Sequence, residues 1–420
     1  MLVAGCFLLL ASHFVSAASE ESLDRTTKAW QAPLQANVST LVYVQLAWRH
    51  GDRTPAASVP FCEESSWSEG LGELTRKGIV QTYHLGKWLR ARYGSWLGEY
   101  FDRNEVYVRS SDYNRTLMSA LANMAGLFPP SKPEMWDPIL TWQPVPVHSV
   151  PRSADKELYE DINCPTAAAE FSTVWKSGVV SKLENDNQDL IDYLRKHAQM
   201  PNFQFYQLWM IYDNLFCMLQ HNDTHKWPSW MNATLFDRLQ KLYDASSRMK
   251  YHTEILRRLR GGPLLKDIID RFIAKRNGML GEKPKLYAYS AHDTTLAAML
   301  STLGIYPEDF PKYATAVLLE LHKRDGEFVV EVYHKNMTDK DEVYRYEIPG
   351  CPHPCTLDAL KTTVHKYLPV DWKSECGLDG PDAVTYMIST AVFACTTALL
   401  GGFLALDLRL CTSFVNDKLG

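Results

Sequence analysis

LVYVQLAW at residues 41–48, followed directly by RHGDRTP at 49–55, is the stretch of sequence that decides the fold. The first part is largely apolar and rich in β-branched and aromatic side chains, which predicts a buried β-strand. The second part is mostly polar, and Gly51 lets its backbone turn tightly and approach a ligand. The sequence therefore predicts a strand that ends in a charged loop.

Two further segments repeat this pattern of a strand that ends in polar residues. The strand expected at 105–108 ends at Arg109-Ser-Ser-Asp112, and the one at 286–289 ends at Ser290-Ala-His292-Asp293. A helical pattern of apolar residues follows each of them. Strands that alternate with helices predict an α/β fold with a largely parallel sheet flanked by helices. Because ligands bind at the carboxyl ends of such strands, we expect all three polar segments at one edge of the sheet.

The side chains expected at this edge suit a phosphate group, because guanidinium groups match the geometry of phosphate oxygens. The candidates are basic apart from one carboxyl group: Arg49, Arg53, Arg109, His50, His292 and Asp293. Each of them alone is more often a surface charge or part of a structural pair. Their occurrence at three strand ends indicates a site for phosphoryl transfer.

The two ends of the chain are typical of targeting segments. Residues 1–18 combine an apolar run with small residues, which predicts a cleaved signal peptide, although no Lys or Arg precedes the run. The alternative, an N-terminal anchor, needs a longer run. Residues 383–406 carry no charge and predict one transmembrane helix, with 407–420 as a short cytoplasmic tail. A buried core helix and a removed lipid-anchor signal are the alternatives, and the charged residues after the run argue against the second.

These segments predict a single-pass type I membrane protein of the secretory pathway, with its catalytic part lumenal or extracellular at the plasma membrane or the lysosome. Glycosylation sequons at Asn37, Asn222, Asn232 and Asn336 agree with that side of the membrane. A fifth sequon, at Asn114, falls in a candidate catalytic segment, so we expect it to be unmodified. The net charge of −5 and the lack of a basic stretch argue against a nucleic-acid partner.

At these residues the sequence resembles the histidine acid phosphatases. The matching strings are RHGDRTP at 49–55, LTRKGIVQTYHLGKWLRARYG at 74–94, VYVRSSDYNRTLMSA at 106–120 and YSAHDTT at 289–295. The resemblance implies an α/β catalytic domain at 38–145 and 260–376 with a smaller helical domain inserted at 146–259. It also implies phosphomonoester substrates, no metal, no other cofactor and a homodimer.

The resemblance assigns a role to each candidate residue. His50 attacks phosphorus and becomes a phosphohistidine, and Asp293 protonates the leaving alcohol. Arg49, Arg53, Arg109 and His292 bind the phosphate. Because arginines nearby should lower the pKa of Asp293, we expect an acidic optimum.

Six cysteines in the expected lumenal part suggest disulfides in an oxidising compartment: Cys62, Cys164, Cys217, Cys351, Cys355 and Cys376. By resemblance, Cys164 pairs with Cys376, and Cys351 pairs with Cys355 rather than binding zinc. Members of the family usually carry a cysteine where this chain reads Tyr313-Ala-Thr-Ala316, so the family partner of Cys217 is absent. Cys62 and Cys217 either pair with each other or are free. The tail lacks the tyrosine of a lysosomal sorting signal.

Two alternatives stay open at this point. The first is a related enzyme of the same superfamily, such as a phytase-like, inositol-phosphate or lipid-phosphate phosphatase. The His292-Asp293 pair fits acid phosphatases and phytases better than the HAE pattern of the inositol polyphosphate enzymes. The second is a catalytically inactive ectodomain that serves adhesion or signalling, against which the presence of every expected catalytic residue argues.

Overall fold

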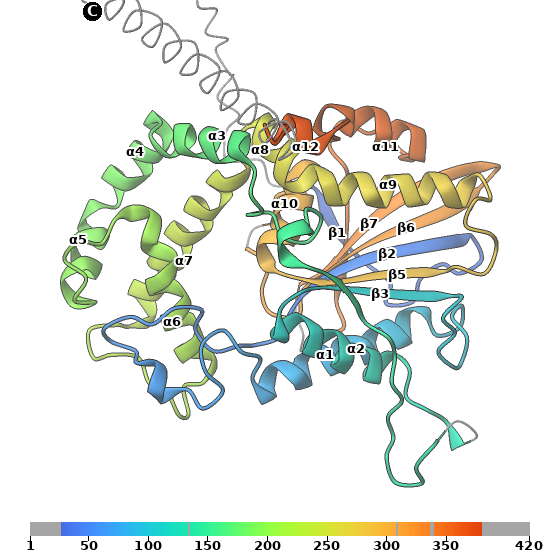
Figure 1. Ribbon diagram of the computed structural model, residues 1–420, viewed down its shortest axis with the longest axis horizontal. Helices are drawn as coiled ribbons and strands as arrows, with labels where there is room; N and C mark the ends of the chain where they lie inside the picture. Colours follow the sequence, from blue (N-terminus) through green and yellow to red (C-terminus); the bar gives the residue numbers. More distant parts are fainter. Residues whose placement is uncertain (1–26, 133–134, 308–309, 337–339, 380–420) are drawn as a thin grey trace, which may run out of the picture.

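One eight-stranded sheet forms the centre of the part of the chain that the computed structural model describes, which comprises residues 27–132, 135–307, 310–336 and 340–379 (Figure 1). The strands follow in the order β1 (Ala29–Ala32), β8 (Val343–Tyr346), β7 (Glu327–Lys335), β6 (Ala316–Arg324), β2 (Leu41–Arg49), β5 (Leu286–Ala291), β3 (Val106–Ser111) and β4 (His148–Val150). The strands expected from the sequence are confirmed as β2, β3 and β5. Because these three are neighbours, the polar segments at their carboxyl ends meet at one edge.

The expectation of a largely parallel sheet is wrong, because the sheet is mixed. Strands β2, β5, β3 and β4 are parallel to one another, whereas β2 pairs antiparallel with β6, and β6, β7, β8 and β1 pair antiparallel in turn. The cause is local. Strands β6 and β7 are joined by Asp325 and Gly326, which both have positive φ, and a tight hairpin of this kind can only join antiparallel strands.

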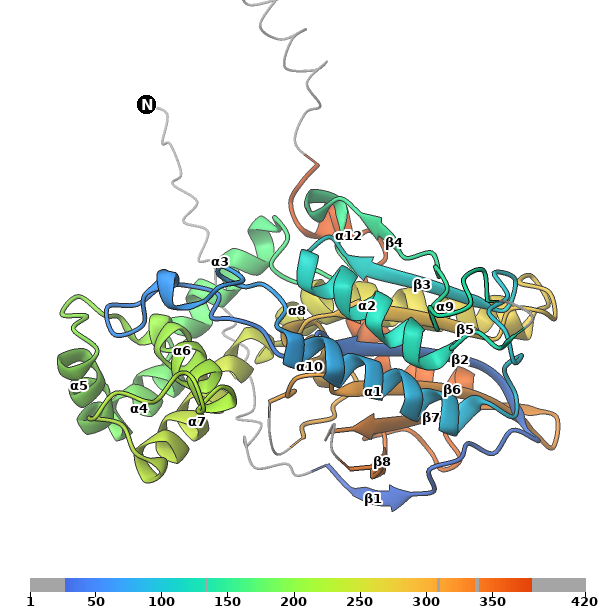
Figure 2. The same ribbon diagram turned by 90° about the horizontal axis from the view of Figure 1, so that it is seen from below.

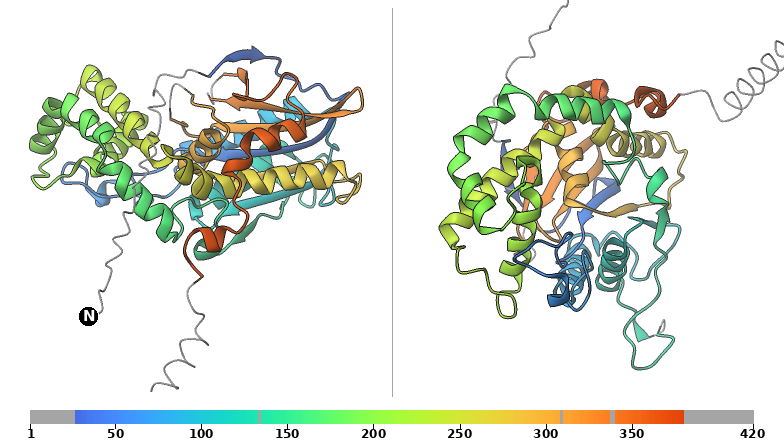
Figure 3. Two further views of the ribbon diagram at one scale, coloured as in Figure 1. Left: turned by 90° about the horizontal axis from the view of Figure 1, so that it is seen from above. Right: turned by 60° about the vertical axis from the view of Figure 1, so that its left-hand side comes forward.

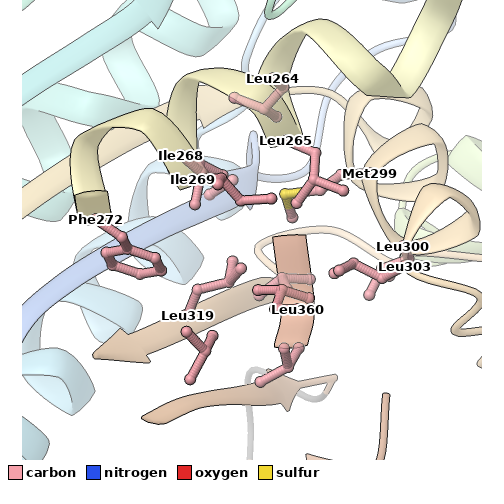
Figure 4. Close-up of a cluster of buried hydrophobic side chains, with 14 of the residues drawn as sticks. Leu264, Leu265, Ile268, Ile269, Phe272, Met299, Leu300, Leu303, Leu319 and Leu360 are labelled. Atoms are coloured by element: carbon pink, nitrogen blue, oxygen red, sulfur yellow. The ribbon is translucent and has the colours of Figure 1, made fainter. Parts of the chain in front are cut away.

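Helices cover both faces of the sheet. Helices α1 (Arg76–Tyr93) and α2 (Asn114–Leu127) lie on one face (Figure 2), and α9 (Gly262–Arg276), α10 (Asp293–Thr302) and α11 (Leu357–Val364) lie on the other (Figure 3). The side chains of β2 alternate between these two layers, as the period of a strand requires. Leu46 and Trp48 pack with α1 and α2, whereas Tyr43 and Ala47 belong to the core beneath α9 and α10. Figure 4 shows that second core, in which Leu265, Ile269 and Met299 meet strand and helix residues.

A group of helices lies beside the carboxyl edge of the parallel strands (Figure 1) and is called the helical lobe below. It comprises α3 (Pro165–Trp175), α4 (Gly178–Asp186), α5 (Gln188–His197), α6 (Leu208–Gln220) and α7 (Ala233–Arg248). Its apolar core is separate from the two cores of the sheet. These helices fall within the range 146–259, which also contains β4 of the sheet.

Short elements connect these layers: the 3₁₀ turns η1 (Glu64–Ser66), η3 (Arg152–Ala154), η4 (Phe205–Gln207), η5 (Met249–Tyr251) and η7 (His365–Tyr367), the helical turns α8 (Glu254–Leu256) and α12 (Trp372–Glu375), and the π-helical turn η6 (Arg257–Gly261). Disulfides Cys164–Cys376 and Cys351–Cys355 confirm the two expected pairs. The first joins the start of α3 to the segment that follows α12.

The expected signal peptide at 1–18, transmembrane helix at 383–406 and cytoplasmic tail at 407–420 lie outside the described residues. Within the described ranges, every helix is too short or too polar to cross a membrane.

Candidate active site

The three polar segments come together at the carboxyl edge of the parallel strands. The backbone N–H of His50 donates to the carbonyl of Ala291 over 3.0 Å, which joins the first segment to the third. The Oγ atom of Ser111 lies 2.9 Å from Nε2 of His292, which joins the second to the third. The rings of His50 and His292 lie with their centroids 5.6 Å apart.

Two glycines allow the loop after β2 to lie directly on the start of α1. A Cβ atom on Gly51 would meet the carbonyl oxygen of Gly78 at 2.2 Å, and one on Gly78 would meet the carbonyl oxygen of Asp52 at 2.1 Å. Both distances are far below van der Waals contact. The backbone of the His50 loop is therefore held against a helix by a contact that only glycine permits.

His50 is buried, with 2% of its surface exposed. Its Nδ1 lies 2.8 Å from the carbonyl oxygen of Gly51. Because a carbonyl only accepts, Nδ1 carries the proton in this contact and Nε2 keeps its lone pair. Burial and then the charges of Arg115, Arg49 and Arg53 hold the pKa of His50 well below its ordinary value. These surroundings therefore favour the neutral imidazole, with the lone pair on Nε2.

Arg49 and Arg53 are buried beside this imidazole, each with a carboxylate partner. Arg49 contacts Asp293, with Nη2 2.9 Å from Oδ2, and its guanidinium lies 4.2 Å from the ring centroid of Tyr313. Arg53 donates two hydrogen bonds to Asp213 of α6, over 3.0 and 2.8 Å. A bidentate pair of this kind fixes the plane of the guanidinium group. The helical lobe thereby holds one of the two expected phosphate ligands from the RHGDRTP loop.

The third expected phosphate ligand, Arg109, is bound to two other carboxylates. Its Nη2 donates to Oδ1 of Asp155 over 2.5 Å and to Oε2 of Glu157 over 3.2 Å. Arg109 is also not among the arginines that lower the pKa of His50 most. The structure thus brings Arg49, Arg53, His50, His292 and Asp293 together, and it pairs Nη2 of Arg109 with Asp155 and Glu157.

Arg115 is the arginine that the sequence analysis did not select. It lies in the first turn of α2 and lines the same cavity as Arg53 and Asp293. Burial and then repulsion by Arg53 lower its pKa to about 10. The sequence contained an indication of this role, because Arg115 falls in the first turn of the expected helix. A positive charge there is unfavourable, since the helix dipole opposes it. An unfavourable charge directly after a polar strand end indicates an anion site.

His292 and Asp293 begin α10 and differ in their preferred charge. Burial and the charge of Arg115 lower the pKa of His292 to about 3, so its imidazole is neutral. Burial raises the pKa of Asp293, but the charges of Arg49 and Arg53 outweigh burial and hold that pKa below its ordinary value. The sequence analysis also expected nearby arginines to lower the pKa of Asp293.

A cavity of about 740 Å³ adjoins these charged groups. The α/β part contributes Arg53, Arg115 and Asp293 to its lining. The helical lobe contributes aromatic side chains: Phe171, Trp175, Tyr206, Trp209 and Tyr243. The cavity has room for a phosphate and an organic group attached to it, and its aromatic lining would contact such a group.

Cys62 and Cys217, whose pairing the sequence left open, are both free. Cys217 lies in the wall of the site, where its Sγ is 3.5 Å from the hydroxyl of Tyr313 and 3.9 Å from Nη1 of Arg53. Burial raises the pKa of Cys217 beyond the physiological range, so its thiol is protonated and unreactive.

Within the described ranges, the donors grouped closely enough to hold a metal ion are Glu320, His322 and Glu331. They lie in β6 and β7, where the carboxylates are already paired with arginines. Glu320 contacts Arg92 over 2.7 Å, and Glu331 contacts Arg324 and Arg345 over 2.8 Å each. This cluster balances its own charge without an ion.

Comparisons with known proteins identify the family of the chain. The family model described as histidine phosphatase superfamily (branch 2) matches residues 40–335. A Caenorhabditis elegans protein named "Putative acid phosphatase 5" is 49% identical over 87% of this chain and 86% of that protein. Human prostatic acid phosphatase is 39% identical over 80% of this chain and 88% of its own. The phytase structure from Citrobacter braakii has a TM-score of 0.62 at 17% identity, with 80% of this chain and 99% of that chain covered, which shows a shared fold.

Proposed function

The chain belongs to branch 2 of the histidine phosphatase superfamily, and we propose from that membership that it is an acid phosphatase that hydrolyses phosphomonoesters through a phosphohistidine at His50. The observation that carries the proposal is the state of His50. It is a buried, neutral imidazole whose Nδ1 proton is held by Gly51 and whose pKa is lowered by three arginines. Such a group is a nucleophile in acid, where most histidines are protonated.

In the first step, Nε2 of His50 attacks phosphorus, the P–N bond forms and the P–O bond to the leaving group breaks. Arg49, Arg53 and Arg115 surround the imidazole with positive charge, which stabilises the negative charge of the transferring group. We assign Arg115 to this set because it lines the cavity with Arg53. Arg109 stays a proposed fourth ligand, with its Nη2 paired to Asp155 and Glu157 and its buried Nε without a hydrogen-bond partner among the described residues.

Asp293 protonates the oxygen that leaves. Its carboxyl group lies beside Arg49 and lines the cavity in which the leaving group has room. His292 is neutral and lies against Ser111, so it positions the phosphate as a hydrogen-bonding group and not as a cation. In the second step, water attacks phosphorus, the P–N bond breaks, and the ionised carboxylate of Asp293 accepts the proton of the water.

The lowered pKa values of His50 and Asp293 therefore favour activity at acidic pH. The lowered pKa of His50 keeps the nucleophile neutral, and a low pH is needed to protonate Asp293, whose pKa is also lowered. Substrate phosphate that binds Arg49 weakens the hold of that arginine on Asp293 and raises the pKa of the carboxyl group again. The optimum should consequently lie on the acid side of neutral.

The test uses the purified lumenal part with a panel of phosphomonoesters that includes aryl, alkyl, lipid and inositol phosphates. We expect turnover of an aryl phosphate in acid, an acid-labile phosphoenzyme that maps to the His50 peptide, and inhibition by vanadate. Chelators should leave the rate unchanged. Loss of activity in EDTA that a divalent cation restores, or an acid-stable phosphoenzyme, would refute the mechanism. Preference for inositol hexakisphosphate over simple esters would favour the phytase-like alternative.

The location of the enzyme is a separate proposal. Exposed asparagines at 37, 222 and 232 are open to glycosylation, and two disulfides fit an oxidising compartment. Together with the charge-free run at 383–406, they support entry into the secretory pathway and an anchor at the carboxyl end. The insertion of residues 146–259 as a domain and the homodimer are predictions from the resemblance alone.

A further inference from the structure

The carboxylate of Asp52 is buried directly behind the nucleophile loop. Asp52 follows His50 and Gly51 in the sequence, and none of its surface is exposed. Its backbone is tied to α1 from both sides, because its N–H donates to Gln81 over 2.7 Å and its carbonyl accepts from the N–H of Thr75 over 3.1 Å. A buried carboxylate needs partners for its charge.

The partners of this carboxylate come from two different parts of the molecule. Its Oδ2 accepts a hydrogen bond from the hydroxyl of Thr75 over 2.5 Å and lies 2.5 Å from Nε2 of His221. Thr75 is the N-cap of α1, whereas His221 is the residue that follows α6 of the helical lobe. Oδ1 has no hydrogen-bond partner among the described residues. His221 is therefore the one basic side chain shown in contact with Asp52 in the described part of the chain.

The same helix makes a second contact with the nucleophile loop. Asp213 of α6 holds Arg53 through two hydrogen bonds, and His221 at the end of α6 holds Asp52. In the first contact an acidic residue of the lobe, Asp213, binds a basic residue of the loop, Arg53. In the second a basic residue that follows α6, His221, binds an acidic residue of the loop, Asp52. Two neighbouring residues of the loop are thus fixed to one rigid element at points eight residues apart along it.

We propose that His221 is a positioning residue for the phosphoryl-transfer reaction, which fixes the loop of His50 and Arg53 through the carboxylate of Asp52. His221 does not line the cavity of the active site and acts only through Asp52. Its ring is itself held, since it lies edge-on to Trp67 with centroids 5.3 Å apart. The proposal rests on the assignment of His50 as the nucleophile.

The test compares His221→Ala with His221→Gln, whose amide can still donate to the carboxylate. Misplacement of a nucleophile and a phosphate ligand by a fraction of an ångström should lower kcat/KM of His221→Ala by about tenfold to 100-fold. Because the loop shapes the site for the transition state, the inhibition constant of vanadate should rise more than that of phosphate. His221→Gln should recover most of both losses.

His225→Ala is the matched control. His225 stacks on the face of the same Trp67 ring, with its centroid 3.8 Å from that of Trp67 and 6.4 Å from that of His221, and its Nε2 lies 2.9 Å from the carbonyl of Ser66. It does not touch Asp52, so its loss should change the melting temperature at most and leave kcat/KM and the ratio of the two inhibition constants as in the wild type.

A double-mutant cycle separates positioning from general stabilisation. Asp52→Asn removes the charge that His221 faces, so His221→Ala should cost much less kcat/KM in that background than alone. Additive losses, equal losses for His221→Ala and His221→Gln, or an unchanged ratio of vanadate to phosphate inhibition would overturn the proposal. Absence of turnover in the wild type would instead refute the proposed function, so the two failures are distinguishable.

Discussion

The Nη2 atom of Arg49 lies 2.9 Å from Oδ2 of Asp293, so the cation beside the nucleophile and the expected proton donor form one largely buried ion pair. In the proposed mechanism, this pair lets a single carboxyl group serve both steps of the reaction. Arg49 stabilises the ionised form that accepts a proton from water, and a phosphate that binds Arg49 favours the protonated form that the leaving group needs.

Asp293→Asn should discriminate between leaving groups. An alkyl alcohol leaves poorly without a proton, whereas a nitrophenol leaves well without one, and general-acid catalysis is worth about 10² to 10⁴ in rate. We therefore expect kcat/KM to fall at least about tenfold more for an alkyl phosphate than for a nitrophenyl phosphate. Equal losses on both substrates would mean that Asp293 only orients His292 or caps α10.

Arg115→Met should move the acid limb of the pH profile. After burial, the charge of Arg115 is the largest effect that lowers the pKa of His50, so its removal lets that pKa rise and His50 becomes protonated at a higher pH. The acid limb of kcat/KM should shift upward in pH, and the lost contact should lower the maximum by about 10²-fold. Arg109→Met is the control, because its guanidinium is bound to Asp155. A larger loss in the control would restore Arg109 as the principal ligand.

Gly78→Ala should lower activity and stability together. The added Cβ would meet the carbonyl oxygen of Asp52 at 2.1 Å, so the nucleophile loop and α1 would have to separate. Overpacking of this kind costs about 1 to 3 kcal/mol of unfolding free energy. Thermal unfolding and kcat/KM measure the two effects. Gly178→Ala is the matched control, because nothing lies within 4 Å of its added Cβ, and it should behave as the wild type.

Truncation after Asp379 should release a soluble, active enzyme. The catalytic residues and the disulfide Cys164–Cys376 all precede this point, and the charge-free run follows it. Fractionation of cells that express the full and the truncated chains, followed by an activity assay, measures the difference. A truncated protein that still sediments with membranes would contradict the proposed anchor.

The sequence by itself determined the strand ends that build the site. An apolar β-rich run before a polar loop can be recognised locally, because burial and backbone turning leave their marks on neighbouring residues. Hence the sequence alone places β2, β3 and β5, and with them His50, His292 and Asp293, in one region. The antiparallel half of the sheet was missed because its evidence is a hairpin turn at Asp325 and Gly326, which the strand–helix pattern does not contain.

Only the tertiary structure decided which charged side chains face the nucleophile. Arg109 in β3 and Arg115 in the first turn of α2 are six positions apart, yet Arg109 is bound to Asp155 and Arg115 lines the cavity with Arg53. The partners Asp213 and His221 are more than 150 residues from the loop that they hold. The physical reason is that charge–charge and hydrogen-bond energies depend on distance in space, and a local pattern of residues carries no information about that distance.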